Sequence, residues 1–220
     1  MAFVTFDLFS ALIDSRTGGT RALARIGDGR GWPVAAATVY DEWDARNKAS
    51  QKSTPEWVSF AEHSRRALAG TYRALDLRGD PDADVATLLA GVSDWPLWPD
   101  VPRSWARLRA RHRLGVLSNV DDDVYARTQV AALVDPADVL TSEGLHAYKP
   151  APQIYRAAVG AGVDVHVPAS ARDTRGALEA GLAVVRVRRP GHQVDPEGPR
   201  PELEVADLTQ LPAVLAGLSR

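Results

Sequence analysis

The first apolar run of the sequence ends at an aspartate, which is the first candidate for chemistry. Residues 3–6 are aromatic or β-branched, as is typical of a buried strand, and Asp7 follows them directly. A carboxylate in this place is costly unless it is paired or used. Open α/β sheets bind their ligands at the carboxyl ends of their strands. Asp7 therefore either caps the turn that follows or belongs to a site at the edge of a sheet.

Later apolar runs are followed by polar side chains in the same way. These side chains are Ser118, Asn119, Lys149, Ser170 and Asp173. Groups at the carboxyl ends of parallel strands converge on one crevice, so we expect all of them to lie near Asp7. A carboxylate, a hydroxyl, an amide, an ammonium group and a second carboxylate are thus predicted to meet in one place.

The elements that position these residues alternate along most of the chain. Strands are expected at residues 3–6, 113–118, 138–141, 163–167 and 182–187. Helices are expected between and after them, at residues 101–111, 121–133, 151–161, 173–180 and 208–218. Strands separated by helices imply a parallel sheet with right-handed crossovers. The Pro- and Gly-rich segment 189–201 is interpreted as a surface loop.

Residues 15–95 interrupt this alternation, because they show only helical signals. Four helices are expected there, at residues 20–26, 33–50, 54–75 and 82–92. Glycines from Gly27 onward are expected to break the first helix, and Thr54 with Pro55 is a start signal for the third. The fold class is therefore α/β: a Rossmann-like parallel sheet, built from residues 1–14 and 96–220, with a four-helix module inserted at 15–95.

Composition excludes several classes of function. The chain has 220 residues, a net charge of −2, 45% hydrophobic residues and no cysteine. It therefore lacks the basic footprint of a nucleic-acid-binding protein, and it can form neither a disulfide nor a thiolate metal site. No apolar run approaches the roughly 18 residues of a membrane span. We expect a cytoplasmic protein that acts on a small molecule, without nucleic acid or membrane as partner.

Four short motifs occur in order along the chain. They are Asp-Leu-Phe-Ser-Ala-Leu at residues 7–12, Leu-Ser-Asn at 117–119, Tyr-Lys-Pro at 148–150, and an acidic loop at 166–177 that leads into Gly-Ala, with Ala-Gly at 180–181. In this order and after these strands, they resemble the motifs of the haloacid dehalogenase-like (HAD) hydrolase superfamily. The resemblance covers the whole chain, because the inserted helices resemble the cap domain of that family.

The resemblance implies nucleophilic catalysis by a carboxylate. Asp7 would attack the substrate and form a covalent ester or acyl phosphate, which water then hydrolyses. Lys149 would keep Asp7 ionised and aimed. Ser118 and Asn119 would hydrogen-bond the anionic or leaving group, and Asp173 would orient Lys149 or the hydrolytic water.

Two positions separate phosphatases from dehalogenases within the resemblance. Phosphatases of the family carry a second Asp two residues after the nucleophile as a general acid, and here that residue is Phe9. They also carry an Asp ligand for Mg²⁺ in the fourth motif, where this chain has Ala169. A halide needs no proton to depart. The chain is therefore similar to the 2-haloacid dehalogenase branch, with Phe9, Tyr155 and Ser170 as substrate-binding residues.

That branch also uses a cap-domain Arg near the leaving halide, for which Arg46 is the candidate, with Lys48 behind it. The chain departs from the family pattern at two places. Ser10-Ala11 replaces Gly-Thr and removes a hydroxyl that usually supports the nucleophile, and Pro168-Ala169 replaces polar residues.

Three functions remain open from the sequence. The first is metal-independent hydrolysis of a 2-haloacid or a similar small organic acid, with no cofactor. The second is a small-molecule phosphatase whose Mg²⁺ would be held by Asp7 and Asp173. The third is a non-catalytic binding protein that kept the fold. A homodimer through exposed cap helices is compatible with each of them.

Other clusters are interpreted structurally. Asp121, Asp122 and Asp123 are expected to cap the helix that they open. The five histidines show no ligand spacing, so no transition-metal site is expected. Trp95 and Trp98 are expected to pack at a hinge between the inserted helices and the sheet.

Overall fold

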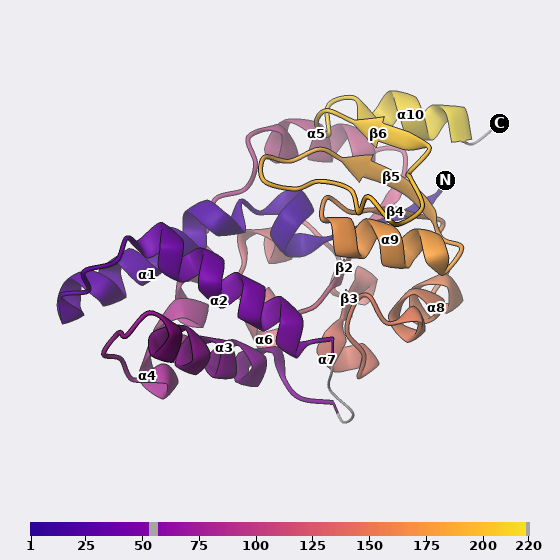
Figure 1. The fold of residues 1–220 in the computed structure, drawn as a ribbon. Helices are drawn as coiled ribbons and strands as arrows, with labels where there is room; N and C mark the ends of the chain where they lie inside the picture. The colour runs from indigo at the N-terminus through magenta and orange to yellow at the C-terminus, as the bar shows by residue number, and fades with distance from the viewer. Residues whose placement is uncertain (53–56, 219–220) are drawn as a thin grey trace.

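The computed structural model describes residues 1–52 and 57–218 and contains one six-stranded parallel sheet (Figure 1). The strand order is β3-β2-β1-β4-β5-β6. The strands are β1 (Phe3–Phe6), β2 (Arg113–Ser118), β3 (Val139–Thr141), β4 (Val165–Val167), β5 (Ala183–Val187) and β6 (Leu203–Val205). The α/β fold class predicted from the sequence is confirmed. The short β6 was not predicted, because three residues beyond a Pro-rich segment carry too little pattern.

Helices cover both faces of the sheet. They are α5 (Asp100–Arg109), α6 (Asp122–Ala126), α7 (Ser142–Leu145), α8 (Pro152–Gly160), α9 (Ala171–Glu179) and α10 (Leu211–Leu218), with short 3₁₀ turns at Gln129–Ala132 and Pro136–Asp138. Val4 and Phe6 of β1 belong to the core that α5 and α10 close, whereas Phe3 packs with the apolar residues of α8 and α9. This division follows from the alternation of side chains along a strand.

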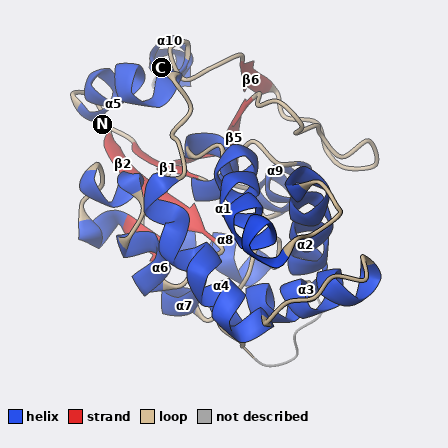
Figure 2. Cartoon of the chain, turned by 90° about the vertical axis from the view of Figure 1, so that its left-hand side faces the viewer, coloured by secondary structure: helices blue, strands red, loops and turns tan. Residues whose placement is uncertain are grey.

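The inserted segment between β1 and α5 is helical, as predicted. It contains α1 (Ser15–Arg30), α2 (Ala36–Ser50), α3 (Phe60–Ala74) and α4 (Pro81–Ala90), followed by a 3₁₀ turn at Gly91–Asp94. These helices pack together beside the sheet (Figures 1 and 2). We propose that residues 15–95 form a cap domain on a core of residues 1–14 and 96–220.

Three of the predicted helices differ from the structure. The helix expected at 121–133 ends at Ala126, and a separate 3₁₀ turn follows at Gln129–Ala132. The helix expected at 20–26 runs from Ser15 to Arg30 without a break at Gly27. It packs so closely against its neighbours that glycines, which have no side chain, are favoured within it. It ends at Gly31, whose φ is 67°. The third helix begins at Phe60, where the hydroxyl of Ser59 accepts a hydrogen bond from the Glu62 N–H. The start signal at Thr54 and Pro55 lies outside the described residues.

The chain leaves and re-enters the sheet region along one antiparallel contact. Ile13 pairs with Leu97, the Asp14 N–H donates to the Pro96 carbonyl, and the Trp98 N–H donates to the Leu12 carbonyl. Trp95 packs against Phe9 with ring centroids 5.7 Å apart. These contacts place the tryptophan pair where the inserted helices join the sheet.

Strand β1 is followed by an unusual turn that the sequence did not predict. Residues Leu8–Leu12 form a single π-helical turn, η1. The buried guanidinium of Arg189 donates to the Ala11 carbonyl at the end of this turn and pairs with Asp100 at 2.7 Å. Segment 189–201 therefore does more than line the surface, because its first residue holds η1 in place.

Close packing of α1 makes a matched test of the fold. A Cβ atom at Gly18 would overlap the Trp95 ring, whereas a Cβ at Gly29 would meet no atom within 4 Å. Gly18→Ala should therefore lower the free energy of unfolding by about 1–3 kcal/mol, the usual cost of overpacking. Gly29→Ala should raise it by up to about 1 kcal/mol, because Ala is the better helix former. Urea unfolding of both variants measures this, and equal effects would contradict the packing.

Candidate active site

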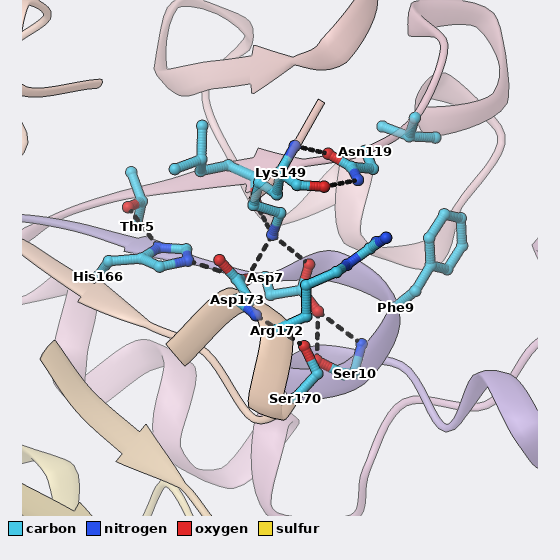
Figure 3. Close-up of polar contacts among 12 residues, drawn as sticks. Thr5, Asp7, Phe9, Ser10, Asn119, Lys149, His166, Ser170, Arg172 and Asp173 are labelled. Atoms are coloured by element: carbon cyan, nitrogen blue, oxygen red, sulfur yellow. Dashed lines mark hydrogen bonds and ion pairs between the residues drawn. The ribbon is translucent and has the colours of Figure 1, made fainter. Parts of the chain in front are cut away.

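The strand-end residues predicted from the sequence meet at the carboxyl edge of the sheet (Figure 3). Asp7 follows β1, Ser118 ends β2, and Asp173 lies in the first turn of α9. Lys149 reaches them from the loop before α8. The chemistry of this cluster is set by the lysine, which comes from none of the strands.

The ammonium group of Lys149 lies between two carboxylates. Its Nζ atom is 2.6 Å from Asp7 Oδ1 and 2.5 Å from Asp173 Oδ2. It also donates to the Leu117 carbonyl at 2.8 Å. An ammonium group has three N–H donors, so all of them are used. The three charged residues are each at most 8% exposed, so solvent screens these contacts weakly.

Burial and charge act against each other on these groups. Burial alone would raise the pKa of Asp7, but the Lys149 ammonium and the hydrogen bond from Ser10 lower it below its ordinary value. The pKa of Asp173 is lowered in the same way, since Lys149 and His166 outweigh its burial. Burial would lower the pKa of Lys149, but the two carboxylates raise it. The pair of carboxylates and the ammonium therefore keep one another ionised.

Asp7 is held at its second oxygen by the turn that follows it. Oδ2 accepts from the Ser10 N–H at 2.9 Å and also from the Ser10 hydroxyl. The motif comparison predicted that the exchange of Gly-Thr for Ser10-Ala11 removes a supporting hydroxyl. That prediction was wrong, because the π-helical turn brings the Ser10 side chain itself to the carboxylate.

Asp173 is held by residues behind it. Its Oδ1 accepts from the Tyr155 hydroxyl at 2.9 Å, and its Oδ2 lies 3.1 Å from His166 Nε2. His166 Nδ1 is 3.0 Å from Thr5 Oγ1, so the ring of His166 bridges Thr5 and Asp173. Tyr155 is fully buried and does not line the cavity, so its predicted contact with substrate is corrected to support of Asp173.

Thr5 and His166 were not singled out from the sequence as site residues. They are register partners on the adjacent strands β1 and β4, and each lies one position before the last residue of its strand. A buried histidine within such a strand is the signal that could have found them.

Ser118 and Asn119 differ in what they offer to a ligand. Ser118 Oγ is buried, lines the cavity and has no hydrogen-bond partner among the described residues. The amide of Asn119 accepts from the Lys149 N–H at 2.7 Å and donates to the Lys149 carbonyl and to Gln51 Oε1. Both N–H donors of its side chain are therefore used within the protein, and Asn119 positions the Lys149 loop while it lines the cavity.

A cavity opens in front of Asp7, between the sheet edge and the inserted helices. Its empty space is about 680 Å³, open mouth included. Its apolar wall consists of Phe9, Tyr40, Trp43, Phe60 and Trp95. Its polar residues, besides those of the cluster, include Ser15, Asp44, Asn47, Lys48, Gln51, Ser170, Arg172 and His192. Phe9 and Ser170, which the sequence predicted as substrate-binding residues, both line this cavity.

The structure does not bring Arg46 to the cavity. Its guanidinium pairs with Glu42 at 2.5 Å on the outer side of α2 and lies beside Gly70 of α3. The cavity-facing residues of α2 recur every three or four positions, at residues 40, 43, 44, 47 and 48. Arg46 is off this stripe, so its predicted role is corrected. Besides Lys149, the cations that line the cavity in the described part of the chain are Lys48 and Arg172, and Arg172 was not predicted.

Asp121 also differs from the prediction. Its carboxylate accepts from the N–H groups of Phe60 and Ala61, so it caps α3 of the insert and not the helix that it precedes. It therefore ties the core to the inserted helices.

The residues present do not fit the Mg²⁺ site of a HAD phosphatase. Asp7 and Asp173 both contact Lys149, so a divalent cation would compete with the ammonium group for the same oxygens. The additional ligand position is Ala169, which is apolar and fully buried. In residues 1–52 and 57–218, no group of three or more His, Asp or Glu side chains could hold a metal ion. We therefore assign no step to a metal.

Comparison with known proteins places the fold. No protein-family model matches the chain, and no curated protein sequence matches it. Among solved structures, it is similar to the L-2-haloacid dehalogenase of Xanthobacter autotrophicus, with 21% identity over 99% of this chain and 100% of that one and a TM-score of 0.84. It is also similar to a defluorinating L-2-haloacid dehalogenase, with 25% identity over 98% of this chain and 95% of that one and a TM-score of 0.83.

A further structure of the Xanthobacter autotrophicus enzyme, with chloropropionic acid covalently bound, is similar with a TM-score of 0.83 at 20% identity over 99% of this chain and 100% of that one. The chain therefore has the fold of the haloacid dehalogenase-like (HAD) superfamily, and its similarity lies with the haloacid dehalogenase branch. Within the described residues, none of the helices is both long and apolar enough to cross a bilayer.

Replacement of Lys149 by Met tests the electrostatics of the cluster. The variant leaves Asp7 and Asp173 buried without their shared cation, so the free energy of unfolding at neutral pH should fall by about 3–5 kcal/mol. In the wild type, the lowered pKa values of the two carboxyl groups stabilise the fold at pH values above the ordinary pKa of a carboxyl group. This stability is lost as the pH falls through the folded-state pKa values. In the variant these pKa values are raised, so protonation on acidification stabilises the fold.

The stability difference between wild type and Lys149→Met should therefore narrow from pH 7 to about pH 4.5, as urea unfolding measures. Lys52→Met, which removes an exposed lysine, is the control and should change stability by less than about 1 kcal/mol at both pH values. A deficit for Lys149→Met that is the same at both pH values would contradict this account.

Proposed function

We propose that this protein is a HAD-type hydrolase that uses Asp7 as a nucleophile and cleaves a carbon–halogen bond in a 2-haloacid or a similar small organic acid without a metal. One observation carries the proposal: Asp7 is a buried, ionised carboxylate that Lys149 holds at the floor of a cavity. The similarity of the fold to L-2-haloacid dehalogenases supports it.

In the first step, an oxygen of Asp7 attacks the carbon that bears the halogen. A carbon–oxygen bond forms, the carbon–halogen bond breaks, and the halide leaves with its electron pair. Phe9 faces the cavity where a phosphatase of this family would have an acid, and a halide leaves without a proton. Lys149 aims the carboxylate, and the Ser118 hydroxyl is free to donate to the substrate's carboxylate.

In the second step, water attacks the carbonyl carbon of the resulting Asp7 ester. The bond between that carbon and the ester oxygen breaks, so the product is a 2-hydroxy acid whose new oxygen comes from Asp7. One proton is released to solvent, and the carboxylate returns to its contact with Lys149. Asp173 acts through Lys149, since both of its oxygens are bound to Lys149, His166 and Tyr155.

Two alternatives have less support. The phosphatase would need a Mg²⁺ site at carboxylates that already share an ammonium group. A protein that only binds a ligand would not need Asp7, Lys149 and the residues that hydrogen-bond to them to be kept together at the floor of the cavity.

Halide release from a panel of 2-haloalkanoic acids, measured in excess chelator, tests the proposal. Wild type should release halide, and Asp7→Asn should lower the rate by roughly 10³-fold or more, because an amide is a poor nucleophile. Asp123→Asn, at an exposed aspartate of α6, is the control and should leave the rate unchanged.

Two outcomes would contradict the proposal. Halide release that Asp7→Asn leaves intact would remove Asp7 as the nucleophile. No release from any acid, together with hydrolysis of phosphate esters that starts on addition of Mg²⁺, would favour the phosphatase.

A further inference from the structure

Arg172 is a cavity cation that the proposed reaction does not use. It stands in the first turn of α9, directly before Asp173, and lines the cavity together with Asp7. In Figure 3 its side chain extends past the position of Asp7 toward Phe9 and Asn119. Its guanidinium donates to the Lys48 carbonyl at 2.9 Å and to Gln51 Oε1 at 3.1 Å, both on the inserted segment.

The charge of Arg172 has no direct counter-ion in the described part of the chain. None of the ion pairs found there involves it, and both of its hydrogen-bond acceptors are uncharged. The other two cavity cations are matched, since Lys149 contacts two carboxylates and Lys48 pairs with Asp44 at 2.5 Å. A guanidinium has five N–H donors, so donors remain for a ligand.

Desolvation makes this arrangement costly without a ligand. Arg172 is largely withdrawn from solvent, and burial lowers the pKa of its guanidinium more than the carboxylates around it, Asp173 first, raise it. A guanidinium nevertheless stays protonated in proteins. A partly buried cation beside a cavity, without an anion in contact, is the arrangement expected of a binding residue for an anionic ligand.

The cavity indicates what else the ligand carries. Phe9 and Phe60 stack with ring centroids 5.7 Å apart, and Trp95 packs against Phe9 at the same distance. An apolar ligand body would be buried against this aromatic wall, which a carboxylate alone would not use. The ligand therefore combines an anionic group with an apolar body that packs against this wall.

Resting on the proposed function, we propose that Arg172 binds the carboxylate of the substrate and makes the enzyme specific for monocarboxylic acids with an apolar or aromatic body. The planar fork of a guanidinium matches the two oxygens of a carboxylate. The halogen is neutral until its bond to carbon breaks, whereas the carboxylate is charged from the moment it binds. Only the carboxylate can therefore compensate Arg172 in the ground state.

Binding of two ligands of the same shape tests this assignment. Phenylacetate and phenylacetamide differ in charge, and neither has a leaving group, so calorimetric titration measures binding without reaction. Wild type should bind phenylacetate more tightly than phenylacetamide and more tightly than acetate. Arg172→Met should weaken phenylacetate binding by roughly 10–100-fold, the range for a lost charge-assisted hydrogen bond. Phenylacetamide binding should not change, which also shows that the cavity of the variant is still folded.

Two further variants complete the design. Arg175→Met removes an arginine from the next turn of the same helix, where it pairs with Glu179 and Asp195, and it should bind phenylacetate like the wild type. Arg172→Lys keeps the charge but not the fork, so it should lie between wild type and Arg172→Met.

Three results would overturn the assignment. The first is an unchanged affinity of Arg172→Met for phenylacetate. The second is an equal loss of affinity for both ligands, which would show a structural role of Arg172 at its contact with Lys48 and Gln51. The third is competition for Arg172 by bromide but not by phenylacetate, which would assign Arg172 to the leaving halide. Because these ligands do not react, failure here is independent of halide release and of Asp7→Asn.

Discussion

The interaction on which this structure depends is the contact of one buried ammonium group with two buried carboxylates. Lys149 lies 2.6 Å from Asp7 and 2.5 Å from Asp173, so one cation compensates two anions in a region from which water is largely removed. Without it, the carboxylates would repel each other, and burial would favour their protonated forms. With it, Asp7 remains an anion with one neighbouring cation, as a carboxylate nucleophile requires.

The rest of the fold serves to hold this contact. The Leu117 carbonyl at the end of β2 accepts the third hydrogen bond of the Lys149 ammonium group. The side-chain amide of Asn119 accepts from the backbone N–H of Lys149 and donates to its backbone carbonyl. The same Asn119 amide reaches Gln51 of the inserted segment, whose side-chain oxygen also accepts from Arg172. The sheet edge and the inserted helices are thus joined next to Asp7, so the position of the helices and that of Lys149 are coupled.

Much of this arrangement was predictable, because strand ends in a parallel sheet lie on one edge. The apolar run at residues 113–118 coincides with β2, and the polar residues after β1, β2 and β4 meet as expected. What could not be predicted depends on packing. Whether residue 46 or residue 48 of α2 faces the cavity depends on how this helix is rotated about its axis against its neighbours. The observed rotation turns Lys48 toward the cavity and Arg46 away from it. Likewise, only the π-helical turn shows that the Ser10 hydroxyl supports Asp7, and only the three-dimensional contacts show that Tyr155 and Asn119 face protein groups.

The central claim is that Asp7 forms a covalent ester with the substrate, and the fate of oxygen in a single turnover tests it most directly. An excess of enzyme reacts with a 2-haloacid in water enriched in oxygen-18, and mass spectrometry then examines both the product and the peptide that contains Asp7. The account predicts a 2-hydroxy acid whose hydroxyl carries ordinary oxygen and an Asp7 carboxylate that has gained the heavy isotope. A product that carries the heavy oxygen, with an unlabelled Asp7, would show direct attack by water and contradict it.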